Sequence, residues 1–181
     1  MALIFAGFYI TGLITPIIGS LQSLVLATGL LNPNTEDSPL PKQAFDYSGQ
    51  FTDINGHLVS LEKYKGKTLF INLWATWCPP CRAEMPHISE LYKKTIDLPN
   101  LEFLMIALDE DFEKSKMLIL DKGYTFPVIH TAYGLNASLQ SQSIPTTLVV
   151  GPTGQVLFYH EGMSQFNTPE FQEFLIRASA D

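Results

Sequence analysis

The chain has 181 residues, 46% of them hydrophobic and 12% aromatic, which is enough apolar material for one folded domain with an appendage. Its net charge is −7, with only 11 Lys and Arg and no run of basic residues, so nucleic acid is not expected as a partner. The two cysteines, Cys78 and Cys81, lie too close in sequence to staple distant parts of a fold.

The first segment, residues 1–31, contains no charged residue and no histidine. A helix needs roughly 20 apolar residues to cross a bilayer, so the segment is long enough. Pro16 interrupts it, and the apolar residues after Pro16 follow the spacing of one helix face. The segment therefore fits a membrane anchor or a helix in the membrane interface, and a buried core helix is the third interpretation. A signal peptide normally opens with basic residues, and none is present.

Residues 32–44 form a second segment, in which prolines stand among small polar residues. This composition predicts an extended linker. Basic residues are scarce on both sides of the apolar segment, which gives little signal for orientation and mildly favours export of the part after it. We expect a membrane anchor or interfacial segment at 1–31, a linker at 32–44 and a folded domain at 45–181.

The folded domain shows its elements in order along the chain. An Asn-Gly pair between two short β-rich runs, 51–53 and 58–60, predicts a hairpin. The strand–helix alternation after the hairpin ends in an antiparallel pair, and this predicts an α/β fold with a mixed sheet and helices on both faces. The further elements are strand 68–74, helix 79–95, strand 101–108, helix 112–122, strands 146–150 and 156–160, and a helix from 169 to about 178.

The two cysteines stand in the run Trp77-Cys78-Pro79-Pro80-Cys81, directly after the first central strand and at the start of a helix. Unpaired N–H groups and the helix dipole stabilise a thiolate at this position. Prolines are tolerated in the first turn because those N–H groups have no intrahelical partner. The pattern predicts a redox pair with an exposed attacking thiolate, Cys78, and a shielded resolving thiol, Cys81.

Two other uses of the cysteines stay open. One is a zinc or copper module, which would add two of the four histidines, but these lack the tight pairing of metal modules. The other is an inert disulfide in a binding module. The succession of strand, Cys-x-x-Cys and helix favours a redox enzyme, and neither a metal nor an organic cofactor is expected.

Residues 45–181 resemble the thioredoxin superfamily, and within it the membrane-anchored thiol–disulfide oxidoreductases of the TlpA/ResA type. The resemblance rests on the run from Asn72 to Pro86, on Ile144-Pro145-Thr146-Thr147, and on the hairpin with Asp53-Ile54-Asn55-Gly56 and Lys65-Gly66-Lys67. It implies an enzyme that reduces disulfides of exported proteins, apocytochrome c among them. It also implies a separate membrane or soluble reductant, and a bacterial cell membrane with the domain facing the periplasm or extracytoplasmic side.

The resemblance also implies a substrate-binding loop. Ile144-Pro145 aligns with the cis-proline loop of the family, which faces the Cys-x-x-Cys pair and binds substrate backbone. An ordinary trans proline is the alternative. Trp77, with Pro79 and Pro80, is expected to offer a contact surface for substrate, although core packing also explains a tryptophan there.

Two polar residues complete the expected site. Glu84 lies three residues after Cys81 on about the same helix face, and burial would raise its pKa so that it exchanges protons for Cys81. A solvated helix glutamate is the alternative. Asn72 stands where general thioredoxins carry a buried aspartate, and it is expected to support the site or to be a hydrogen-bonded core amide. The acidic run Asp109-Glu110-Asp111 is expected to be solvated loop charge.

Overall fold

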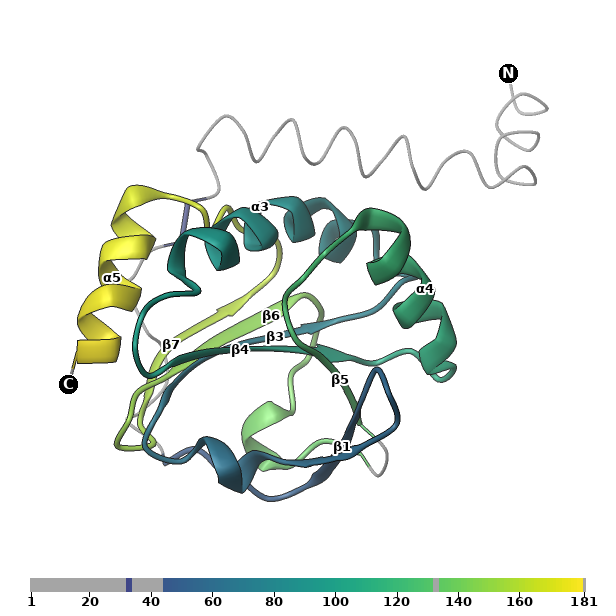
Figure 1. Cartoon of the computed structure of the whole chain (residues 1–181), viewed down its shortest axis with the longest axis horizontal. Coiled ribbons are helices and arrows are strands. Elements are labelled where there is room, and N and C mark those ends of the chain that lie inside the picture. The colour runs from purple at the N-terminus through teal and green to yellow at the C-terminus, as the bar shows by residue number, and fades with distance from the viewer. Residues whose placement is uncertain (1–31, 34–43, 132–133, 181) are drawn as a thin grey trace.

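A computed structural model of the chain describes residues 32–33, 44–131 and 134–180 (Figure 1). The predicted apolar segment at 1–31 and most of the linker lie outside these residues. In the part that is described, no helix is both long enough and apolar enough to cross a bilayer. The division into three parts therefore stays a prediction, and the structure concerns the folded domain.

The folded domain is built on a seven-stranded mixed sheet with the strand order β2-β1-β5-β4-β3-β6-β7. Its centre is parallel, because β3 pairs with β4 and β4 with β5, whereas the other neighbours are antiparallel. The predicted mixed α/β architecture is confirmed. The strands are β1 (Gln50–Asp53), β2 (Leu58–Ser60), β3 (Thr68–Trp74), β4 (Leu101–Ala107), β5 (Val128–Thr131), β6 (Thr146–Val150) and β7 (Val156–Glu161).

The described helices divide unequally between the two faces of the sheet. Residues of all three α-helices enter one core cluster, and the other cluster draws instead on two short 3-10 helices. The crossovers from β3 to β4 and from β4 to β5 advance in the same direction, so right-handed connections put their helices on one side. The prediction that helices cover both faces is correct only because the two 3-10 helices lie on the face opposite the α-helices. The helices are α3 (Pro79–Thr95), α4 (Phe112–Lys122), α5 (Pro169–Ala180), η1 (Leu61–Tyr64) and η2 (Ala137–Leu139).

Strand β3 is the most protected element, with every one of its residues buried. It lies between β4 and β6, and both of its faces are covered. Phe70 points to the α-helical side, where its ring stacks on Phe103 at a centroid distance of 4.7 Å and meets Phe166 and Phe171 edge-on. Packing on both faces explains why the sequence of this strand is a nearly continuous apolar run, interrupted by Thr68 and Asn72, rather than an alternation. The strand ends where the redox motif begins, so the motif starts from a rigid base.

The predicted hairpin is present at the edge of the sheet. Gly56 has φ 82°, the left-handed backbone that an Asn-Gly turn requires. The Asp53 carboxylate accepts the N–H groups of Asn55 and His57 and closes the turn. Strand β1 then pairs with β5 on its other side, so the hairpin extends the sheet at the edge away from β6 and β7.

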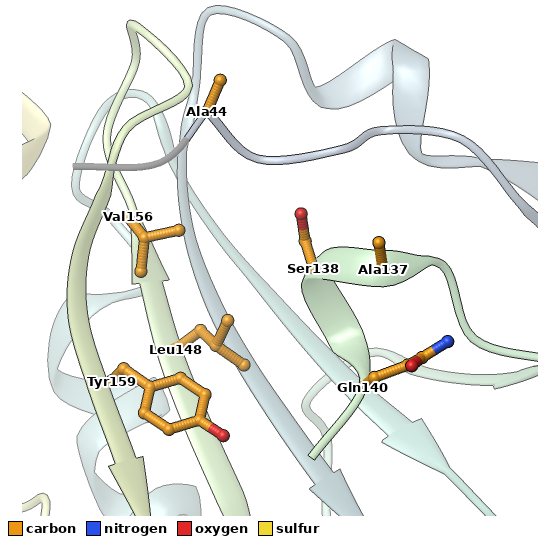
Figure 2. A pocket seen from close by; sticks show the side chains of 7 residues that line it. All are labelled: Ala44, Ala137, Ser138, Gln140, Leu148, Val156 and Tyr159. Carbon is orange, nitrogen blue, oxygen red and sulfur yellow. The ribbon is translucent and has the colours of Figure 1, made fainter. Parts of the chain in front are cut away.

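The face of the sheet opposite α3 holds a cavity of about 110 Å³ (Figure 2). Leu148 of β6 and Tyr159 of β7 line it from the sheet, and Ser138 of η2 from the other side. Leu148 and Tyr159 are register partners on the face that turns away from the helices. The cavity is therefore separated from the cysteines by the sheet.

Candidate active site

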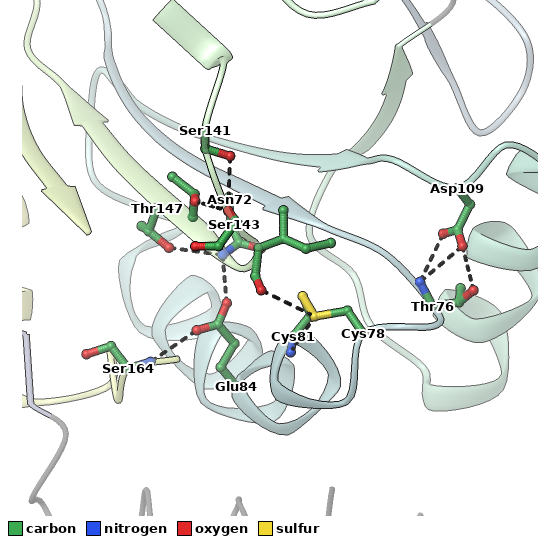
Figure 3. Close-up of a disulfide and its surroundings, with 12 residues drawn as sticks. Asn72, Thr76, Cys78, Cys81, Glu84, Asp109, Ser141, Ser143, Thr147 and Ser164 are labelled. Atoms are coloured by element: carbon green, nitrogen blue, oxygen red, sulfur yellow. Dashed lines mark hydrogen bonds between the residues drawn. A yellow bond between two sulfur atoms is a disulfide. The ribbon is translucent and has the colours of Figure 1, made fainter. Parts of the chain in front are cut away.

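The redox motif follows directly on the end of β3 (Figure 3). Cys78 is the N-cap of α3 with extended backbone, φ −93° and ψ 104°, and its sulfur accepts the N–H of Cys81 at 3.2 Å. Pro79 and Pro80 occupy the first turn, where an N–H is not needed. The sulfurs of Cys78 and Cys81 are joined in a disulfide. The structure thus places both predicted cysteines at the positive end of a helix, as the sequence predicts.

The exposure of the cysteines differs from the expectation. Cys81 is fully buried, as predicted, but Cys78 is only 3% exposed, so the predicted exposed sulfur is wrong for this disulfide form. The reason is the loop before β6, whose Ile144 carbonyl oxygen lies 3.7 Å from Cys78 Sγ. A disulfide sulfur has no hydrogen to donate, so this is a packing contact. The loop covers the sulfur that the sequence alone leaves open.

The loop that covers Cys78 contains the predicted cis bond, between Ile144 and Pro145. Its far side is tied to β7, because the N–H of Gly162 donates to the Pro145 carbonyl at 2.8 Å. The Thr146 hydroxyl donates to the Ser143 carbonyl at 2.6 Å and closes the loop on itself. Ile144, expected from the resemblance, therefore lies against Cys78, and Pro145 follows it in a loop with its own internal hydrogen bonds.

Glu84 is fully buried, which excludes the solvated helix glutamate. Burial raises its pKa to about 8, against the lowering effect of hydrogen bonds from Asn72 and from the Ser164 N–H. Those donors reach Oε1 at 2.8 Å and Oε2 at 3.2 Å. The carboxyl group thus changes its charge near neutral pH, in the range where a proton carrier for a thiol is useful.

Asn72 comes from the middle of β3 and is also fully buried. Its Nδ2 donates to Glu84 and to the hydroxyl of Thr147, at 2.8 and 3.0 Å. Thr147 is its register partner on β6. The two predicted polar site residues are thus in direct contact, and both interpretations of Asn72 hold, since the core amide also supports the carboxyl group.

Trp77 is 65% exposed, so core packing does not explain it. It borders an open hollow of about 510 Å³ between the loop after β3 and the N-terminus of α4. Glu110, Asp111 and Lys114 also line this hollow. A large apolar side chain kept in water beside a reactive pair is a natural contact for another protein.

The loop that carries Trp77 is fixed by Asp109, a buried residue just beyond β4. Its carboxylate accepts the N–H and hydroxyl of Thr76 (Figure 3). It also accepts the hydroxyl of Ser115 of α4. The expectation of solvated loop charge is therefore wrong for Asp109. Parallel strands β3 and β4 end at the same edge of the sheet, and this could have indicated that a carboxylate after β4 meets the loop after β3.

No group of three or more His, Cys, Asp or Glu in the described part of the chain is arranged to hold a metal ion. The four histidines all belong to that part. His57 pairs with Asp53, and His130 contacts the Asp109 carbonyl oxygen. Among the described residues, the geometry therefore places no third ligand beside Cys78 and Cys81.

A disulfide at the N-terminus of a helix that comes after a central strand, faced by a cis-proline loop, defines a thiol–disulfide oxidoreductase of thioredoxin-like fold. A family model described as the AhpC/TSA family matches residues 41–159. The chain belongs to this family. It is 34% identical over 122 residues to the thioredoxin-like protein YneN of Bacillus subtilis, covering 67% of this chain and 71% of YneN. It is 29% identical over 126 residues to the thiol-disulfide oxidoreductase ResA of Halalkalibacterium halodurans, covering 68% and 70%.

Solved structures support the same fold. StoA from Bacillus subtilis superposes with a TM-score of 0.59 at 20% identity, over 74% of this chain and 97% of StoA. The thioredoxin domain of a thiol-disulfide oxidoreductase from Bacteroides vulgatus gives 0.63 at 19% identity, over 75% and 98%. At these identities the likeness establishes the fold. The predicted thioredoxin-like class is confirmed.

Proposed function

We propose that this oxidoreductase reduces disulfides of exported proteins, apocytochrome c among them, through Cys78 and Cys81 and with Glu84 as the proton carrier. The observation that carries the proposal is the buried Glu84 carboxyl group on the same helix as the disulfide, one turn beyond Cys81. No observation favours a second function.

The reaction begins from the dithiol form of the enzyme. The Cys78 thiolate attacks one sulfur of a substrate disulfide, which forms a mixed disulfide and releases the other substrate sulfur as a thiolate. The Cys81 thiol then loses its proton to Glu84 and attacks Cys78 Sγ. This releases the second substrate thiolate and leaves the Cys78–Cys81 disulfide. A separate reductant must return two electrons to start the next cycle, and the proton held on Glu84 goes back to Cys81.

Each residue has a physical reason for its part. The Cys81 N–H already points at Cys78 Sγ, and with the helix dipole it stabilises negative charge on that sulfur. A free thiol has a pKa of about 8.5. The pKa of Glu84 is raised to about 8, so its carboxylate is basic enough to accept a proton from a thiol.

The substrate surface would combine Trp77, Pro79 and Pro80 on one side of Cys78 with Ile144 and Pro145 on the other. Trp77 supplies exposed apolar area next to the hollow, and Ile144 lies against the sulfur itself. A substrate chain that enters between them would bring its disulfide to Cys78 Sγ. In the disulfide form the loop that carries Ile144 covers Cys78, which is 3% exposed.

The proposal that the substrates are exported proteins rests on the uncharged segment 1–31 and on the resemblance to membrane-anchored reductases. We propose that the segment attaches the protein to the bacterial cell membrane, with the folded domain on the periplasmic or extracytoplasmic side. Reduction rather than oxidation is proposed from the same resemblance.

One experiment tests activity and direction together. The full-length chain in its dithiol form is mixed with an oxidised exported protein, and the redox state of both partners is followed by thiol alkylation and mass spectrometry. The proposal predicts that substrate thiols appear as the Cys78–Cys81 disulfide forms. It would be abandoned if the enzyme disulfide instead oxidised reduced substrate and the reverse transfer did not occur.

A second experiment tests the location. Bacterial cells that produce the full-length chain are treated with a protease that does not cross the membrane, after the outer layers are made permeable. The folded domain should be removed while a cytoplasmic marker stays intact. Protection of the domain together with the marker would contradict the proposed side of the membrane.

A further inference from the structure

Three fully buried polar side chains form a row next to the disulfide: Glu84, Asn72 and Thr147 (Figure 3). Asn72 lies in the middle, with Nδ2 2.8 Å from Glu84 Oε1 and 3.0 Å from Thr147 Oγ1. Both N–H groups of the amide are therefore used. The Glu84 carboxyl group and the Thr147 hydroxyl together determine the orientation of one amide.

The other end of that amide has no partner. Asn72 Oδ1 is buried and accepts no hydrogen bond from the described residues. A buried amide oxygen without a donor costs free energy, so the observed orientation must be held by the two bonds to the nitrogen. Turning the amide would bring Oδ1 to Glu84. An oxygen there repels a carboxylate but accepts a hydrogen bond from a neutral carboxyl group.

We propose that Thr147 is a positioning residue for Glu84 and acts through Asn72. Its hydroxyl accepts one N–H of the amide and so keeps the nitrogen directed at Glu84. This stabilises the charged carboxylate, the form that takes the proton from Cys81. The use of that proton in catalysis rests on the proposed function. The contact of Thr147 with Asn72, and of Asn72 with Glu84, does not depend on it.

Thr147 suits this task because its hydroxyl oxygen has lone pairs that accept an N–H of the amide. In the present orientation it accepts from Nδ2 at 3.0 Å. A methyl group in its place accepts no hydrogen bond. Without the Thr147 acceptor, the nitrogen-inward orientation loses one of its two bonds, and the Glu84 carboxylate loses support.

Titratable groups on the elements next to Glu84 must be separated from it in a titration. On α3 the next turn carries His87, and on β7 the register partner of Thr147 is His160. Burial lowers the pKa of both imidazoles. Strands β3 and β6 carry no charged residue, and the segment between β7 and α5 contributes the Ser164 N–H. His87 and His160 are thus the groups whose titration must be controlled for.

The test is a direct titration of Glu84 in the oxidised full-length chain, by the carbon-13 NMR signal of its carboxyl group. Glu84→Gln identifies the signal. Because the disulfide is intact and does not titrate, the readout needs no exchange activity and separates this inference from the proposed function. His87→Gln and His160→Gln show which part of any shift comes from the imidazoles.

Thr147→Val should raise the pKa of Glu84 by about half a unit to one unit, the size of one lost hydrogen bond. Thr147→Ser keeps the hydroxyl and should titrate like the natural protein. Thr68→Val is the matched control, since Thr68 is another fully buried threonine, with its hydroxyl bonded to the Ala178 carbonyl. If Thr147→Val does not fold, Thr147→Ala is used in its place and should raise the pKa of Glu84 in the same way.

A double variant tests whether the effect passes through the amide. Asn72→Ala should raise the pKa of Glu84, and adding Thr147→Val should then change nothing further. The inference is overturned if Thr147→Val leaves the pKa of Glu84 unchanged, if Thr147→Ser shifts it equally, or if the two substitutions are additive.

Discussion

The carboxylate of Asp109 accepts both the N–H of Thr76, at 3.0 Å, and its hydroxyl, at 2.6 Å. Ser115 of α4 donates a third hydrogen bond at 2.5 Å. One buried side chain thus ties the loop before Cys78 to the helix that comes after β4. The position of the attacking sulfur depends on an element remote from it in sequence.

Asp109→Asn should therefore destabilise the fold and slow exchange. The new amide group has fewer lone pairs for three donors and brings an N–H against them, at a cost of about 1–3 kcal/mol. Urea unfolding of the oxidised protein measures the loss. Asp111→Asn is the control, because Asp111 caps α4 and asparagine caps a helix equally well. Equal stability of the two variants would show that the Asp109 contacts contribute nothing.

The two cysteines should behave differently when each is replaced by serine. Cys78→Ser removes the attacking sulfur and should abolish exchange with a substrate disulfide. Cys81→Ser keeps the attack but removes the resolving sulfur, so mixed disulfides should accumulate and be visible by non-reducing electrophoresis and mass spectrometry. Turnover by Cys78→Ser, or mixed disulfides on Cys81 alone, would reverse the assignment.

Trp77→Ala should weaken the reaction with protein substrates while leaving stability nearly unchanged. The side chain is 65% exposed, so its removal takes little from the core, and surface substitutions usually change stability by less than about 0.5 kcal/mol. Rates are measured with a protein disulfide and with a small disulfide, which separates substrate binding from chemistry. Only the rate with the protein disulfide should fall. Leu120→Ala, on α4 and also 65% exposed, is the matched control. A loss of the same size in both variants would remove Trp77 from the substrate surface.

The sequence predicts the elements around the redox motif well, because their signals are local. Helix 79–95 agrees with α3 at both ends, since prolines mark its start. Strand β5 was missed: it has four residues, only two of them buried, and becomes a strand by pairing with β4 and β1. Pairing between distant segments leaves no periodicity in a run so short.

The residues of the candidate site also divide into those with a local sequence signal and those whose contacts come from distant segments. Cys78 and Cys81 are predicted from a motif, and Pro145 and the role of Glu84 from a resemblance, whereas the sequence leaves the burial of Glu84 open. Thr147 and Asp109 were missed as partners, because their contacts cross between strands or between loops. The predicted exposure of Cys78 failed for a similar reason, since the covering residue is Ile144, 66 positions further along the chain.

Glu84 should make the stability of the oxidised protein fall as the pH rises. The pKa of this carboxyl group is about 8 in the fold and 4.5 as its ordinary value, so between these two pH values the folded state keeps a proton that the unfolded state has lost. The stabilisation is complete below about pH 4.5 and is lost up to about pH 8, with a slope approaching 1.4 kcal/mol per pH unit. His87 and His160, whose pKa values are lowered by burial, act in the opposite direction as the pH falls below 6.5.

Glu84→Gln isolates this contribution, because glutamine keeps the shape of the side chain and cannot ionise. Urea unfolding of both oxidised proteins at several pH values gives the difference in their free energies of unfolding. The protein with Glu84 should be most stable relative to Glu84→Gln at low pH, and the difference should shrink between pH 5 and 8 and stay constant above. Both proteins contain the two histidines, so the contribution of the histidines cancels in the difference. The pH dependence of the rate of exchange should change in the same range, because no carboxylate remains to take the proton of Cys81. A difference that is flat from pH 5 to 8 would mean that Glu84 stays charged throughout, and would remove it as the proton carrier.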